Sequence, residues 1–352
     1  MKFVHVTIAP IGSLEKYKIA KTGYFCWHRA FGAKPMQHVF ARGTLSEYDI
    51  ILVVISKAEL DGMLISEIRK EVGFGNDAPK IIACPDYAIQ LWQTGYLPRV
   101  LEFELKQADM VFVPCENMIG RLESIAHRKI YVIDHPVDIE GLSKIEPSQP
   151  NTAVPIVSLV HRYDYNWYDP WLATKDLPWP AGAMLMTREV ALTASPYFEI
   201  KFPEMKYDDF LPWMKSRKVM VDSYHFVNAW GRMQVECAVL GVPCVGTSAV
   251  KTQKDLWPGL TTAPADTYSQ GRLIYKLMTD EEFRKDQLTF AAQRVNGYGF
   301  ADRKRHLLKV LNEETGYEEN KEERAETPET PAEGTEGDDC RAVSQECEVK
   351  AG

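Results

Sequence analysis

The residues best suited to chemistry lie between positions 217 and 250, where polar side chains interrupt a largely apolar stretch. Gly231 lies near the start of a helical pattern and allows a ligand to approach the backbone closely. The first N–H groups of a helix have no intrahelical partner, so they can bind a phosphate group. Glu236 follows five residues later, about a turn and a half into the same helix. The spacing predicts a phosphate-binding helix start with a carboxylate nearby.

The elements that must position these residues can be read from the same stretch. A short apolar strand at 219–221 precedes a polar loop, and a helix is expected at 229–240. Gly241 is placed to end that helix, and a second apolar strand is expected at 242–245. This order is typical of a parallel sheet, in which the loops at the carboxyl ends of the strands form the binding site.

Simpler interpretations of the same residues remain open. Asn228 is a suitable N-cap for the helix, and Glu236 can pair with Arg232 at i,i+4 spacing. The doublet Asp208-Asp209 is placed to start a helix. It is the one Asp-Asp doublet in the folded body, which has no Asp-x-Asp pair for a metal.

Length and pattern predict two α/β domains and a tail. Through residues 1–140, short apolar runs that predict strands alternate with helical patterns: the runs lie at 3–8, 49–55, 80–84, 110–113 and 130–133, and the helical patterns near 59–72, 98–107 and 117–126. A Ser/Pro/Gln/Asn-rich linker covers 141–153, and a second alternating series covers 154–298. A closing helix is expected at 299–312. Residues 313–352 hold 14 acidic and 4 basic residues, so the tail carries −10 and the body +2. A tail of this composition is expected to be disordered.

Cysteine usage and hydropathy exclude several classes of protein. The seven cysteines form no C-x-x-C pair, so neither a disulfide framework nor a zinc site is predicted. No apolar run approaches the length of a membrane span, and no signal peptide is evident after Met1. We therefore expect a cytoplasmic protein.

Three stretches carry a resemblance to a known family: N-A-W-G-R-M-Q-V-E-C-A-V-L-G-V-P-C-V from Asn228, A-D-M-V-F-V-P-C from Ala108, and K-I-Y-V-I-D-H-P-V-D from Lys129. Together they resemble family-4-type retaining glycosyltransferases, which have the GT-B fold of two Rossmann-like, doubly wound parallel-sheet domains and a closing C-terminal helix. Gly231, Glu236, Gly241 and Pro243 match the family signature. Asn228 stands where the family has its first Glu.

The resemblance implies transfer of a hexose from a nucleotide sugar, expected to be UDP-linked, to a hydroxyl acceptor with retention. It implies no cofactor and no obligatory metal, because helix dipoles and cations stabilise the leaving diphosphate. The implied donor-binding residues are Gly12, Arg162, Gly231, Arg232, Met233 and Glu236, with Glu236 on the ribose. Asn228 would contact the sugar, and Asp86 would act as base or orient the sugar, unless it only forms a Pro-Asp turn.

Three other functions remain open for this fold. Because Asn228 cannot supply negative charge, the chain could be a catalytically weakened module that binds a sugar nucleotide. GT-B enzymes also include glucosyltransferases that modify hydroxymethylated DNA bases. A sugar-nucleotide epimerase shares the fold as well.

A basic and aromatic segment at 16–42 bears on the acceptor. It contains no acidic residue, and basic side chains alternate with aromatic ones. This pattern suits a phosphate-bearing acceptor, nucleic acid or an anionic membrane surface, and it is equally typical of an amphipathic helix with an aromatic core. The candidate contacts are Lys16, Lys18, Lys21, Trp27, His28 and Arg29.

Overall fold

The computed structural model describes residues 1–8, 20–85, 98–148, 154–160, 167–185, 198, 200–202, 205–224 and 230–317. Residues Met1–Tyr317 form one compact unit, and residues 318–352 lie outside the described residues. Two six-stranded sheets, in which every described strand pair is parallel, make up the compact unit. None of the helices in the described ranges is both long and apolar enough to cross a membrane.

The first sheet has the strand order β2-β1-β3-β4-β5-β6. Its strands are β1 (Phe3–Thr7), β2 (Pro35–Gln37), β3 (Ile50–Val54), β4 (Lys80–Cys84), β5 (Met110–Val113) and β6 (Tyr131–Val132). Its helices are α2 (Trp27–Ala30), α3 (His38–Ala41), α4 (Lys57–Asp61), α5 (Leu64–Val72), α7 (Pro98–Gln107), α8 (Ile119–Ala126) and α9 (Ile139–Ser143), the last leading toward the second sheet.

Neighbouring strand residues point to opposite faces of the first sheet, and both faces are buried. One face packs in a cluster with α5, α7 and α8, through residues such as Val4, Ile51 and Leu105. The alternate residues, such as Phe3 and Ile50, pack in a second cluster with Trp27 of α2 and with Leu307, Val310 and Leu311 of the last helix. The apolar runs of the sequence therefore form a central layer between two helical layers.

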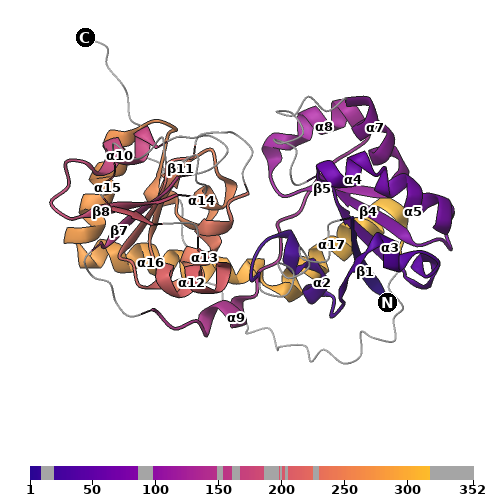
Figure 1. The fold of residues 1–352 in the computed structure, drawn as a ribbon, viewed down its shortest axis with the longest axis horizontal. Helices are drawn as coiled ribbons and strands as arrows, with labels where there is room; N and C mark the ends of the chain where they lie inside the picture. Colours follow the sequence, from indigo (N-terminus) through magenta and orange to yellow (C-terminus); the bar gives the residue numbers. More distant parts are fainter. Residues whose placement is uncertain are drawn as a thin grey trace, which may run out of the picture. The chain divides into compact units, whose positions relative to one another are not determined.

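The second sheet has the order β12-β11-β10-β7-β8-β9. Its strands are β7 (Ile156–Val160), β8 (Ala181–Leu185), β9 (Ile200–Phe202), β10 (Val219–Asp222), β11 (Cys244–Thr247) and β12 (Thr261–Thr262). Around it lie α10 (Tyr168–Thr174), α12 (Tyr207–Lys215), α13 (Arg232–Leu240), α14 (Lys251–Leu256), α15 (Thr267–Thr279) and α16 (Glu281–Val295), shown in Figure 1. The two sheets give the two-domain GT-B architecture.

The final helix, α17 (Phe300–Thr315), leaves the second sheet and packs on the first. It contacts α2 and β5, and in Figure 1 it lies beside the strands of the first sheet. It runs beyond the expected end at 312, so the predicted tail begins inside a helix.

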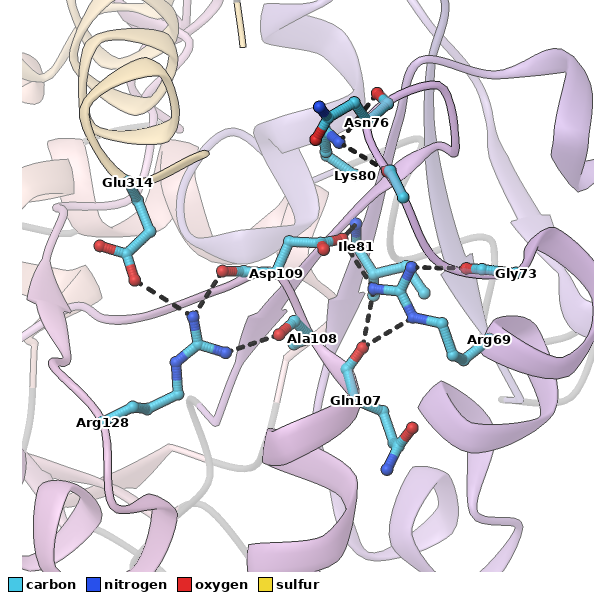
Figure 2. A network of polar contacts seen from close by, with 11 residues as sticks. Arg69, Gly73, Asn76, Lys80, Ile81, Gln107, Ala108, Asp109, Arg128 and Glu314 are labelled. Carbon is cyan, nitrogen blue, oxygen red and sulfur yellow. Dashed lines mark hydrogen bonds and ion pairs between the residues drawn. The ribbon is translucent and has the colours of Figure 1, made fainter. Parts of the chain in front are cut away.

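A polar network fixes the end of α17 to the first sheet (Figure 2). Arg128 donates to the carbonyls of Ala108 and Asp109 and pairs with Glu314 at 3.2 Å. Tyr131 donates a hydrogen bond to the other carboxylate oxygen of Glu314. These contacts lie where β5 begins, at the edge of the sheet opposite the carboxyl ends of the strands.

The strands expected in the first domain are confirmed with small shifts at their ends, and β2 and β12 were missed because they are three and two residues long. The helical pattern at 59–72 is two helices, α4 and α5. Met63 separates them with a left-handed backbone (φ 46°), which an apolar repeat does not reveal.

Candidate active site

The start of α13 is built around Gly231, the N-cap residue, whose φ of 94° is left-handed. A Cβ at this position would lie 2.2 Å from Val250 Cγ1 and 2.3 Å from Thr252 Oγ1. The Thr252 hydroxyl donates to the Gly231 carbonyl at 2.6 Å, so a side chain at the start of α14 contacts the backbone at the start of α13. Glycine is therefore required here by the close packing of two protein segments, a role that the spacing in the sequence did not indicate.

No side chain of a described residue caps α13, and its first turn contains no acidic residue. The N–H groups of that turn therefore remain available to an anion. The Met233 side chain is 6% exposed and belongs to the core, so only its backbone can take part.

Glu236 lies at the centre of a buried polar cluster. It is 1% exposed, and its Oε1 accepts hydrogen bonds from Thr22 Oγ1 (2.6 Å), Tyr207 OH (2.6 Å) and Arg232 Nε (2.7 Å). The i,i+4 pair with Arg232 that the sequence allowed is present. Among the described residues, none donates to the second oxygen, Oε2.

Two partners of Glu236 could not be anticipated from its neighbourhood. Thr22 belongs to the part of the chain that builds the first sheet, and Tyr207 begins α12. The Arg232 guanidinium carbon lies 4.1 Å from the centroid of the Tyr207 ring, and burial beside Glu236 raises the pKa of Tyr207 well above its usual value. Tyr207 therefore stays a neutral hydrogen-bond donor at every working pH.

A second buried pair lies at the carboxyl end of β10. Gln234 Nε2 donates to Asp222 Oδ2 at 2.6 Å, and both residues are almost fully buried. Sequence reasoning missed this pair, although a signal existed. Asp222 directly follows the predicted strand at 219–221, at the edge where sites form in parallel sheets.

Several predicted site residues lie outside the described residues, namely Gly12, Lys16, Lys18, Asp86, Arg162 and Asn228. Each belongs to a segment that follows the carboxyl end of a strand: β1, β4, β7 or β10. Their predicted site roles stay predictions. Asn228 is not the N-cap of α13, because the helix begins at Arg232 and not at 229, and its N-cap is Gly231.

The basic and aromatic segment at 16–42 is divided where the structure describes it: Trp27 and His28 are buried, whereas Lys34, Phe40 and Arg42 are exposed. Trp27 is 0% exposed and its Nε1 donates to His135 Nδ1 at 3.1 Å. His28 is 5% exposed, and burial, helped by Arg29, lowers its pKa to about 4, so it is neutral at pH 7. Trp27 and His28 are core residues, which corrects their assignment as polyanion contacts.

Two cations of this segment, Lys21 and Arg29, share one carboxylate. Arg29 Nη2 lies 2.6 Å and Lys21 Nζ 3.5 Å from Asp138 Oδ2. Asp138 also caps α9 by accepting from Gly141 N at 2.9 Å. Lys21 and Arg29 therefore brace the connection between the two sheets, and their charge is already compensated locally.

Metal ligation finds no support in the described part of the chain, where no group of three or more His, Cys, Asp or Glu side chains is placed to hold an ion. The doublet Asp208-Asp209 lies in the first turn of α12, as expected for a helix start.

No family model and no curated protein matches this chain. Solved structures do. HepE of Anabaena, in complex with UDP and glucose, is 14% identical with a TM-score of 0.63, over 89% of this chain and 100% of that one. The trehalose-6-phosphate synthase OtsA is 11% identical with a TM-score of 0.67, over 89% of this chain and 99% of that one. A structure described as trehalose-6-phosphate from E. coli bound with UDP-2-fluoro glucose gives a TM-score of 0.57 at 11% identity, over 74% of this chain and 72% of that one. The chain has the GT-B fold of these glycosyltransferases.

Proposed function

We propose that this protein is a GT-B glycosyltransferase that moves a hexose from a UDP-linked sugar to a hydroxyl acceptor, with retention at the sugar carbon. The likeness to HepE in complex with UDP and glucose, along nearly the whole chain, carries this proposal. The uncapped first turn of α13 supports it, because that turn follows the carboxyl end of β10, where parallel sheets bind their ligands.

The donor diphosphate would be held by the N–H groups of Arg232 and Met233 and by the Arg232 side chain, which is 38% exposed. As the bond between the sugar and the diphosphate breaks, negative charge develops on the phosphate oxygens. A helix N-terminus and a guanidinium stabilise that charge without a metal. Arg162 and Gly12 would add to the donor site.

The sugar and the ribose would be read by different residues. Glu236 Oε2 would accept from a ribose hydroxyl while Oε1 stays anchored to the protein. Asn228 would hydrogen-bond the transferred sugar, and Asp86 would orient the sugar or act as base toward the acceptor. The five cysteines in the described part of the chain are free and buried, which favours a reducing cytoplasmic location.

The direct test is turnover of the full chain with UDP-glucose in excess EDTA, followed by UDP release and by the anomeric configuration of the product. We expect release to persist in EDTA and the product to keep the configuration of the donor. A panel of glycan, lipid-linked and nucleic-acid acceptors would identify the acceptor class.

Calorimetry with UDP and with uridine separates an enzyme from a binding module. Tighter binding of UDP than of uridine, together with turnover, supports the proposal. Tighter binding without turnover on any acceptor would identify a sugar-nucleotide binding module in which Asn228 has replaced the family Glu. Equal binding of both ligands, or strict dependence on manganese or magnesium, would contradict the donor site described above.

A further inference from the structure

A cavity of about 340 Å³ lies apart from the residues assigned to the donor. It is lined by residues of α14, α16 and α17 and by Asp134, which follows β6. None of Gly231, Arg232 and Glu236 lines it. Its volume is at the lower end of the roughly 300–1,000 Å³ typical of small-molecule sites.

The two carboxylates of this cavity are already compensated by protein groups. Lys251 Nζ lies between them, 2.8 Å from Asp134 Oδ1 and 2.6 Å from Asp255 Oδ2. Asp134 also accepts from Trp230 Nε1 at 2.9 Å, and Asp255 accepts from the Tyr298 hydroxyl at 3.0 Å. Neither carboxylate therefore needs a bound cation.

Two arginines of the cavity wall have charge or hydrogen-bond donors that no described residue compensates. Arg303 pairs with Asp134 Oδ2 at 3.2 Å, but its Nε–H is buried and has no hydrogen-bond partner among the described residues. Arg294 donates to the Asp255 carbonyl at 3.4 Å, and no carboxylate of the described chain pairs with its charge. Buried donors are normally satisfied, so an unpaired guanidinium N–H in a cavity wall indicates a missing acceptor.

Charge and backbone geometry favour an anion as the ligand of this cavity. The cavity wall carries three cations, Lys251, Arg294 and Arg303, against two carboxylates. Gly297 and Tyr298 line it immediately before α17, a helix whose N-cap Gly299 makes no side-chain capping bond. Guanidinium groups match the geometry of phosphate oxygens, and a helix N-terminus adds favourable potential.

We propose that this cavity binds a phosphate group, either free or as the monoester of a small metabolite, through Arg294 and Arg303. Arg294 contributes an uncompensated charge from α16, and Arg303 contributes a free N–H from α17. The site shares no lining residue with the donor site, although its Lys251 lies between Val250 and Thr252, which contact Gly231. We expect it to be occupied whether or not UDP is bound, and it does not depend on the proposed function.

The test is isothermal titration calorimetry of the full chain at low salt, with inorganic phosphate, glycerol phosphate and glycerol as probes. Each titration is repeated at saturating UDP. The main variant is Arg294→Gln. Its matched control is Arg284→Gln, because Arg284 lies on the same helix and likewise donates to one backbone carbonyl, that of Lys218, at 2.8 Å. A second variant, Arg303→Lys, retains the charge near Asp134 but removes the Nε–H.

We expect both phosphates to bind and glycerol not to bind, with the same affinity in the presence of UDP. Arg294→Gln should weaken binding at least tenfold, Arg303→Lys several-fold, and Arg284→Gln less than twofold. Equal affinities for the two phosphates would identify free phosphate as sufficient, and tighter glycerol phosphate would identify a monoester. The proposal is overturned if neither phosphate binds, if UDP abolishes binding, or if Arg294→Gln and Arg284→Gln behave alike.

Discussion

The substitution Glu236→Gln separates the structural and the ligand-binding contributions of one carboxylate. Oε1 of Glu236 accepts three hydrogen bonds of 2.6–2.7 Å, from Thr22, Tyr207 and Arg232, whereas Oε2 has no donor among the described residues. Glutamine keeps one carbonyl oxygen, so the two hydroxyl bonds can persist. It loses the negative charge and replaces the second oxygen by an NH₂ group.

The stability cost follows from the three bonds that lose their ionic character. A hydrogen bond to a charged group contributes about 1.5–3 kcal/mol and a neutral one about 0.5–1.5 kcal/mol. Arg232 is 38% exposed and regains hydration when its partner becomes neutral, so its share is small. We expect the free energy of unfolding to fall by about 1–2 kcal/mol. If Oε2 binds the ribose, UDP affinity should fall by about 1–3 kcal/mol, which is roughly 5- to 150-fold.

Denaturant unfolding and UDP calorimetry on the same preparations measure both quantities. Tyr207→Phe is the control, since it removes one donor to Oε1 and leaves the carboxylate charged. That variant should lose about 1 kcal/mol of stability and keep its UDP affinity within twofold. If Glu236→Gln also keeps its UDP affinity within twofold while losing stability, Glu236 is a structural residue and the alignment with the family signature is wrong.

Three further outcomes can be measured by unfolding alone. Gly231→Ala should lower the free energy of unfolding by more than about 2 kcal/mol, because the new Cβ meets side chains at 2.2–2.7 Å. Gly241→Ala has nothing within 4 Å of the new Cβ and should lose only about 1 kcal/mol, for its left-handed φ of 73°. Equal losses would contradict the packing account. Burial lowers the pKa of His28 to about 4, so the unfolded state binds a proton that the folded state does not. His28 should therefore lower the free energy of unfolding by up to about 1.4 kcal/mol per pH unit as pH drops from 6.5 to 4, in addition to the buried His5, whose pKa is lowered to about 3. His28→Gln should remove the His28 share of this slope and leave the His5 share, and an unchanged slope would rule His28 out. Removing residues 318–352 should leave the melting temperature unchanged. Removing residues 313–352 also removes the contacts of Glu314 with Arg128 and Tyr131, and it should lower the melting temperature by several degrees. Equal melting temperatures of the two truncated proteins would show that the Glu314 contacts contribute nothing.

Most of the fold could be predicted because parallel strands buried on both faces appear as continuous apolar runs. The runs at 80–84 and 110–113 are β4 and β5 without any shift of their ends. Short edge strands such as β2 carry too few residues for a pattern. The left-handed Met63 depends on tertiary packing that no local rule describes.

The candidate site was less predictable, because its contacts join residues far apart in the chain. The pair of Arg232 and Glu236 follows from helical spacing, but the hydrogen bond from Thr22 crosses 214 positions. The aromatic residues at 24–31 illustrate the opposite error. Trp27 and its neighbours have the types of a binding surface, and their burial was decided by α17, which the chain supplies nearly three hundred residues later.

The packing of α17 has a consequence for biosynthesis. Leu307, Val310 and Leu311 complete one face of the sheet whose first strand begins at Phe3. When the first 148 residues have emerged from the ribosome, all six strands of that sheet have been synthesised, whereas α17, the helix that covers this face, has not. The nascent N-terminal domain therefore exposes apolar surface until α17 has emerged. We expect chaperones to bind this surface during that interval.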